Sequence, residues 1–289
     1  MDHDAFSKCH PVVNLVFFLG AIGFGVVIQH PLYMIAGCVT AAAYYLLLRG
    51  RAGGKLLLGM IPAFIVLSAV NPLFNTYGEH VLFTVFGNPY TLEALFYGMS
   101  IAGIFVAMML WFNCYSIVLT SDKFVCLFGS LIPSLSLLLV MVLRMIPNLM
   151  RKGKQIMGVR KSIGKGAGAD STRKDKVLDG MTMLSALTDW ALEGSIVTAD
   201  SMRSRGYGCA KRTSFQIYRM SIRDWLLLVL MLLLAAAVIF AGGTAATFTP
   251  VFSIASPTWG LAAYWAYLLI PIALHVKEAF TWHISISKI

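Results

Sequence analysis

Two short basic segments of the chain end in glycine and carry residue types that recognise carboxylates. One is S-M-R-S-R-G-Y-G at residues 201–208, and the other is R-K-S-I-G at residues 160–164. An arginine guanidinium pairs with a carboxylate through two parallel hydrogen bonds, and small neighbouring residues let another backbone approach closely. Both segments are therefore predicted to dock onto an acidic protein surface. The candidate docking residues are Arg203, Ser204, Arg205 and Gly206 in the second segment, and Arg160, Lys161, Ser162, Ile163 and Gly164 in the first.

The same pattern also has a purely structural interpretation. Glycine just past a helix end adopts the left-handed conformation readily, and basic residues in the last turn suit the negative end of the helix dipole. The apolar side of the preceding helix favours docking, because such a side must be covered by lipid, by a neighbouring helix or by a partner. This helix is expected to start at Thr188 or Asp189, to end at Gly206, and to carry Leu192, Ile196, Ala199 and Met202 on one side.

Several other kinds of chemistry are excluded by the residues present. No GxxxxGK[ST] phosphate loop occurs, and the five cysteines show no CxxC spacing. The basic region has no interleaved stacking aromatics, which argues against nucleic acid as a partner. The apolar segments are nearly free of charged residues, which argues against a carrier with its own ion path. The chain is expected to be no enzyme and to bind no metal or cofactor.

The composition is that of an integral membrane protein. The chain has 289 residues, of which 58% are hydrophobic and 12% are charged, and its mean hydropathy is +0.76. Apolar runs near the roughly 20 residues that a spanning helix needs predict an all-α, polytopic helical membrane protein with about six spans and a coupling region of amphipathic helices. The predicted spans are 11–29, 32–48, 56–74, 92–118, 225–245 and 259–276.

A basic region divides the chain into residues 1–143, 144–224 and 225–289. Residues 144–224 hold 16 Lys and Arg against 7 Asp and Glu, a net charge of +9. Basic loops stay on the cytoplasmic side, so this region and both termini are predicted to be cytoplasmic in the plasma membrane. The parity of the spans then leaves two alternatives: one of the spans is misassigned, or the apolar segment 124–147 does not cross. Pro133 offers a break in this segment and favours a bent segment that is partly re-entrant or lies at the cytoplasmic face.

Two helices are expected in the basic region. Pro147 suits the first turn of one, which continues through Leu149, Gly153, Ile156, Arg160 and Ile163. The glycine-rich and charged residues 164–176 predict a flexible connection to the second helix. The methionines of these helices form either an adaptable contact with a partner or the packing between the two helices. They are Met145, Met150, Met157, Met181, Met183 and Met202.

Over most of its length the chain resembles the transmembrane T component of energy-coupling factor transporters, which are uptake systems related to ABC transporters. Ser204, Arg205 and Gly206 are similar to the family's Ala-Arg-Gly docking motif, and L-R-M-I-P-N-L-M at 143–150 is similar to the segment that leads into its first coupling helix. N-P-L-F-N-T-Y-G-E-H-V-L-F at 71–83 and T-L-E-A-L-F-Y-G at 91–98 look like its membrane-side pattern. The first docking motif differs, because Ser162, Ile163 and Gly164 stand where the family usually has Ala-Arg-Gly. Arg160 and Lys161 are the alternatives for the missing charge.

The resemblance implies a non-catalytic scaffold in the membrane. It implies two ATPase subunits that use ATP and dock on the coupling helices, and a membrane S component that binds a vitamin or a transition metal ion. Two alternatives belong to other functional classes. One is a self-contained secondary transporter, and the other is a membrane-anchored assembly or regulatory protein whose basic helices bind lipid.

Overall fold

The computed structural model of the chain describes residues 6–75, 81–85, 88–129, 133–164, 172–209, 220–241, 246–247, 253–254 and 258–286. It divides into two compact units. The first unit joins Met1–Phe124 with Tyr218–Ile289, and the second is Val125–Ile217. The predicted division at residue 144 falls inside a continuous helix of the second unit, which begins at Pro133, about three turns before its first basic residue, Arg144.

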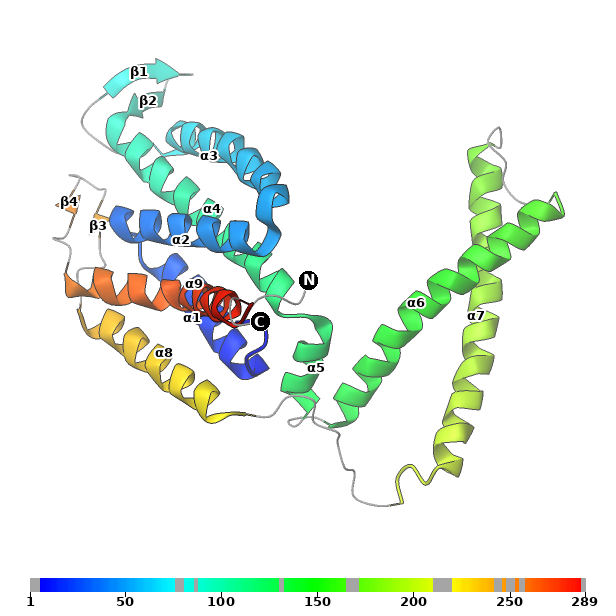
Figure 1. The fold of residues 1–289 in the computed structure, drawn as a ribbon. Helices are drawn as coiled ribbons and strands as arrows, with labels where there is room; N and C mark the ends of the chain where they lie inside the picture. The colour runs from blue at the N-terminus through cyan, green and yellow to red at the C-terminus, as the bar shows by residue number, and fades with distance from the viewer. Residues whose placement is uncertain are drawn as a thin grey trace. The chain divides into compact units, whose positions relative to one another are not determined.

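The first unit is built from apolar helices, with two short pairs of antiparallel strands (Figure 1). Within the residues that the structure describes, five of its helices are long and apolar enough to cross a membrane, and α1 is a shorter apolar helix. The predicted fold class, an all-α polytopic membrane protein, is confirmed. The strands were not predicted from the sequence. The helices are α1 (Pro11–Val27), α2 (Pro31–Arg49), η1 (Gly50–Gly53), α3 (Gly54–Phe74), α4 (Leu92–Val118), α8 (Ile222–Ala241) and α9 (Trp259–Ile286). The strands are β1 (Val81–Val85), β2 (Asn88–Thr91), β3 (Ala246–Thr247) and β4 (Ser253–Ile254).

A repeated His-Pro pair starts the first two helices. The Nδ1 atom of His10 accepts a hydrogen bond from the backbone N–H of Val12 at 3.3 Å, and His30 does the same for Leu32 at 3.2 Å. The proline that follows each histidine occupies the first helical turn, where its missing N–H costs nothing. The local sequence therefore determines where α1 and α2 begin.

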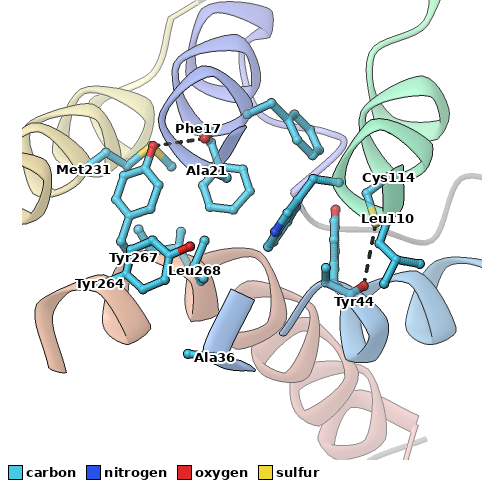
Figure 2. Close-up of a cluster of buried hydrophobic side chains, with 14 of the residues drawn as sticks. Phe17, Ala21, Ala36, Tyr44, Leu110, Cys114, Met231, Tyr264, Tyr267 and Leu268 are labelled. Carbon is cyan, nitrogen blue, oxygen red and sulfur yellow. Dashed lines mark hydrogen bonds between the residues drawn. The ribbon is translucent and has the colours of Figure 1, made fainter. Parts of the chain in front are cut away.

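An aromatic cluster joins α1, α4 and α9 in the core of the first unit (Figure 2). Phe17 is fully buried, stacks on Tyr267 with a centroid separation of 5.4 Å, and meets Trp111 edge to face at 5.6 Å. The hydroxyl group of Tyr267 donates a hydrogen bond to the backbone oxygen of Phe17 at 3.0 Å. Packing and hydrogen bonds of this kind hold helices together in a bilayer, where the hydrophobic effect between helices is weak.

Gly20 lets α9 approach α1, and replacing it by alanine is expected to destabilise the first unit. A Cβ atom at position 20 would overlap the ring and hydroxyl of Tyr267, whereas one at Gly23 on the same helix would meet nothing within 4 Å. Overpacking of this kind costs about 1–3 kcal/mol. Thermal unfolding of the detergent-solubilised protein measures the effect, and Gly23→Ala is the matched control. Equal melting temperatures for the two variants would contradict the close α1–α9 contact.

Lys123 anchors the chain just before the second unit begins. Its ammonium group is buried and donates hydrogen bonds to the hydroxyl of Ser7 at 2.9 Å and to the backbone oxygen of Val118 at 2.8 Å. Phe6 is fully buried against the rings of Phe17 and Phe18. Because an ammonium group offers three donors and no acceptor, these oxygen atoms satisfy most of its hydrogen-bonding capacity. The N-terminal residues are thereby tied to the end of α4.

The second unit consists of two long helices that follow α5 (Ser121–Gly129), which contains the boundary between the units. They are α6 (Pro133–Ser162) and α7 (Arg173–Ser204). The sequence predicted a break at Pro133 within 124–147, and α6 begins at Pro133 whereas α5 ends at Gly129; residues 130–132 lie outside the described part of the chain. The predicted helix start at Pro147 is wrong, because Pro147 lies inside α6. Helix α6 has already run for fourteen residues before Pro147, and the one backbone hydrogen bond that an internal proline removes does not end it.

The predicted start of the second helix at Thr188 or Asp189 is also wrong. A capping box closes the N-terminus of α7 at Thr172, whose side chain and backbone exchange hydrogen bonds with Asp175. The hydroxyl of Thr188 instead donates to the backbone oxygen of Leu184 within the helix at 2.8 Å. The charged residues 172–176, predicted to be part of a flexible connection, therefore form a helix start, and residues 165–171 lie outside the described part of the chain.

Candidate coupling surface

Helices α6 and α7 cross as an antiparallel pair (Figure 1). Gly153 is buried at the crossing, where a Cβ atom would lie 3.5 Å from Leu187 and 3.8 Å from the sulfur of Met183. The absence of a side chain at Gly153 allows the two backbones to approach. The predicted side of the first helix, which includes Gly153, therefore faces α7.

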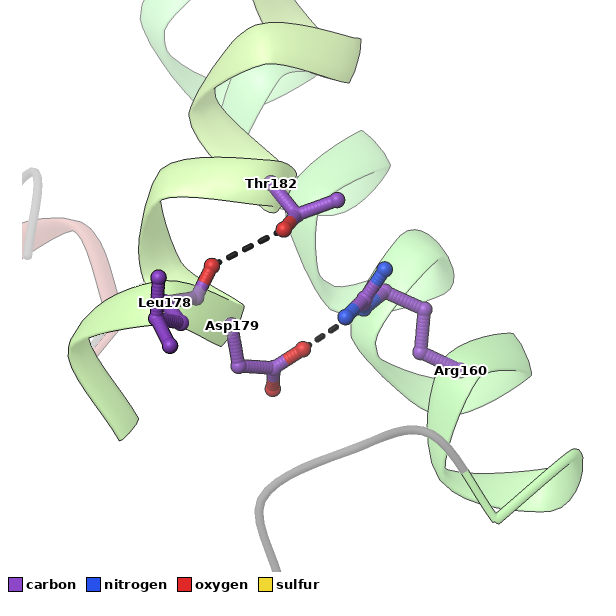
Figure 3. A network of polar contacts seen from close by, with 4 residues as sticks. All are labelled: Arg160, Leu178, Asp179 and Thr182. Carbon is purple, nitrogen blue, oxygen red and sulfur yellow. Dashed lines mark hydrogen bonds and ion pairs between the residues drawn. The ribbon is translucent and has the colours of Figure 1, made fainter. Parts of the chain in front are cut away.

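Charged side chains hold the crossing on both sides of Gly153. The Nε atom of Arg160 lies 2.6 Å from a carboxylate oxygen of Asp179, in an ion pair whose side chains are only 23% and 15% exposed (Figure 3). Lys152 lies over the ring of Trp190 at 5.7 Å from its centroid. Arg160, which the sequence offered as a docking residue, thus makes a contact within the second unit.

The C-terminus of α7 forms a Schellman motif around Gly206. The backbone N–H of Gly206 donates to the oxygen of Arg203 at 3.0 Å, and that of Tyr207 donates to the oxygen of Met202 at 3.0 Å. Gly206 has φ = 78°, a left-handed conformation in which glycine avoids the steric cost of a Cβ atom. The predicted end of this helix at Gly206 is confirmed. Arg203, Ser204 and Arg205 are exposed at the tip.

The C-terminus of α6 also ends at a left-handed glycine. The backbone N–H of Gly164 donates to the oxygen of Lys161 at 3.2 Å, and Gly164 has φ = 68°. Lys161, Ser162 and Ile163 are exposed, and Ile163 keeps 62% of its surface accessible. The two candidate docking segments are therefore both exposed helix ends closed by a left-handed glycine.

The two helix ends lie far apart on the second unit. Because α6 and α7 are antiparallel and Arg160 contacts Asp179, the end of α6 lies beside the first turns of α7. The stretch of α7 from Asp179 to Gly206 is about 40 Å long at 1.5 Å per residue. The structure therefore does not bring the two predicted segments into one site. It presents them as two separate tips of one helix pair.

An apolar side of α7 is exposed along most of the helix. No residue of α7 is buried within the second unit. The sequence predicted Leu192 and Ile196 on this side, but it missed the N-terminal half because it started the helix too late. The apolar residues of this N-terminal half also recur at three- and four-residue spacing, and this spacing is the sequence signal that predicts a longer helix. The large apolar residues, each 59–64% exposed, are Val177, Leu178, Met181, Leu184, Leu192, Ile196 and Val197.

The methionines divide between the two predicted roles. Met183 packs beside Gly153 at the crossing. Met150, Met157 and Met181 are 61%, 49% and 64% exposed and remain available for a partner. Unbranched thioether side chains adapt to different surfaces at little cost, so these three are suited to an adjustable contact.

Among the described residues, no group of three His, Cys, Asp or Glu side chains is placed to hold a metal ion. Comparison of the chain with protein-family models and with curated proteins finds no match. The functional assignment therefore depends on the residues of the second unit and on their chemistry.

Proposed function

We propose that this chain is the transmembrane coupling subunit of an ATP-driven energy-coupling factor uptake transporter. It links two ATPase subunits to a membrane S component that binds a vitamin or a transition metal ion. The chain itself is non-catalytic and binds no cofactor, and ATP is hydrolysed by the partner subunits. It lies in the cell membrane with the second unit and both termini in the cytoplasm.

The observation that carries this proposal is the pair of exposed basic helix ends at opposite ends of one helix pair. Each end is closed by a left-handed glycine and carries a small residue beside a basic one. The two tips lie about 40 Å apart, so a single binding groove cannot accept both of them. Two related subunits, each with its own groove, can bind one tip each. Basic tips also require acidic acceptors, because complementary charge directs and orients association.

The exposed apolar side of α7 supports a third partner. Six of these apolar side chains, from Val177 to Ile196, lie along 20 residues on one side of α7 and form a surface that a water-soluble helix does not leave uncovered. An apolar membrane subunit lying against this side would cover it. Motion of the ATPases at the tips would then reach that subunit through α6 and α7, which the Arg160–Asp179 ion pair and the Gly153 crossing hold together.

Copurification tests the proposal against its two alternatives. The chain, affinity-tagged at its native expression level, is extracted in mild detergent, and the bound proteins are identified by mass spectrometry. We expect two nucleotide-binding subunits and a small apolar membrane protein, with ATP hydrolysis by the complex. A secondary transporter would purify without ATPases. A membrane-anchored assembly or regulatory protein, whose basic helices bind lipid, would also purify without ATPases.

A further inference from the structure

The two helix ends of the second unit correspond residue by residue. Gly164 and Gly206 occupy the same left-handed position, and each donates its N–H to the oxygen three residues earlier, in Lys161 and in Arg203. The residue before each glycine also donates its backbone N–H to the oxygen four residues earlier, from Ile163 to Val159 at 3.1 Å and from Arg205 to Ser201 at 3.3 Å. Because the two glycines occupy the same backbone position, the residues that precede them can be matched one to one between the ends of α6 and α7.

The alignment assigns an equivalent residue to each position of the tip. Lys161 corresponds to Arg203, Ser162 to Ser204, and Ile163 to Arg205, whereas Arg160 corresponds to Met202. Residues at the same position before a helix end project in the same direction relative to its axis. The basic group that both tips share therefore stands three residues before the glycine, at Lys161 and Arg203.

The contacts of Arg160 separate it from this shared position. Its guanidinium pairs with Asp179 across the crossing, and both side chains are more than three-quarters covered. Turning Arg160 toward a partner would leave the carboxylate of Asp179 partly buried without its counter-charge, which is costly. Lys161 is the next residue, lies one position away around the helix, and is exposed.

We infer that Lys161, and not Arg160, is the group through which the end of α6 binds an acidic side chain of its partner, as the equivalent of Arg203 on α7. This inference rests on the proposed function. The chemistry at the two tips differs, since an ammonium group is a point charge and a guanidinium is a two-pronged donor. The α6 tip makes a single ionic contact beside the apolar Ile163, and the α7 tip offers two arginines. Lys161 on one tip and Arg203 on the other therefore each pair with a carboxylate, and the two carboxylates occupy equivalent positions in two related subunits.

Binding of the full chain to its purified ATPase subunits tests the assignment. Lys161→Ala is expected to weaken binding roughly tenfold or more, as for an ion pair that is desolvated in an interface. Lys161→Arg is expected to restore the affinity, because the charge returns. The double variant Arg160→Ala with Asp179→Ala removes both members of the internal pair and is expected to bind within about threefold of the wild type. Circular dichroism of each variant checks that the helices remain.

Two results would overturn the assignment. One is wild-type affinity for Lys161→Ala. The other is loss of binding for the double variant with its helical content unchanged, because that result would place the docking charge on Arg160. The variant Arg205→Glu separates this inference from the proposed function. If Arg205→Glu loses the ATPases and Lys161→Ala does not, only the assignment of Lys161 fails. If the wild-type chain binds no ATPase, the proposed function is refuted, and the assignment of Lys161 is refuted with it.

Discussion

Replacing Arg205 by glutamate is expected to abolish uptake and to detach an ATPase subunit while the chain stays inserted in the membrane. Arg205 is exposed at the tip of α7, directly before the left-handed Gly206 that closes the helix. Breaking a buried, hydrogen-bonded charge pair on one side costs about 2–5 kcal/mol of binding, largely because the partner charge is left unpaired. Each 1.4 kcal/mol is about a tenfold change in affinity, so the loss is about thirtyfold to several thousandfold. A reversed charge adds repulsion to this loss.

The measurement compares ATPase retention and substrate uptake in cells and in reconstituted vesicles. Lys154→Glu is the matched control, because it reverses one exposed charge on α6 about two turns before Lys161 and outside both tips. We expect this control to keep wild-type uptake. Normal transport by Arg205→Glu, with insertion levels equal to those of the wild type, would refute docking through the end of α7.

Two substitutions of Ile163 are expected to act in opposite directions. Ile163 is 62% exposed and takes the place that Arg205 occupies on the other tip. Ile163→Asp would place a carboxylate in an apolar contact and next to an acidic partner surface, and it is expected to release the subunit at this tip. Ile163→Arg would provide the planar donor present at the other tip, and it is expected to keep or strengthen the contact.

ATPase retention during detergent purification at low and at high salt measures both effects. The wild-type contact at the α6 tip is expected to lose less affinity with salt than the α7 contact, because it carries fewer exposed charges. Gln155→Asp, an exposed position two turns earlier on α6, controls for the added charge. Release by Ile163→Arg, or full retention by Ile163→Asp, would show that Ile163 does not occupy the docking position.

Local sequence predicted much of this fold because membrane helices are determined by composition. An apolar run of about 20 residues has few stable alternatives in lipid, where every backbone group must be satisfied within the segment. The His-Pro pairs, Pro133 and Gly206 likewise act within one turn of the chain, so they indicate where helices start or stop. The exposed basic tips were predictable for the same reason.

Other features depended on residues that only the folded chain brings together. The sequence offered Arg160 and Lys161 equally as docking charges, and the crossing of α6 with α7 pairs Arg160 with Asp179. Thr188 is a favourable N-cap by type, yet Thr172 with Asp175 closes the helix a full sixteen residues earlier.

The sequence by itself determined an α-helical membrane protein with two basic, glycine-ended helix tips. It did so because hydropathy, capping and charge act over a few neighbouring residues. The tertiary structure alone decided that α6 and α7 are antiparallel, that Gly153 admits the crossing, and that Arg160 is used internally while Lys161 and Ile163 remain exposed. Those outcomes depend on side chains about 20 to 40 positions apart, whose contact energy exists only once both helices have formed and met.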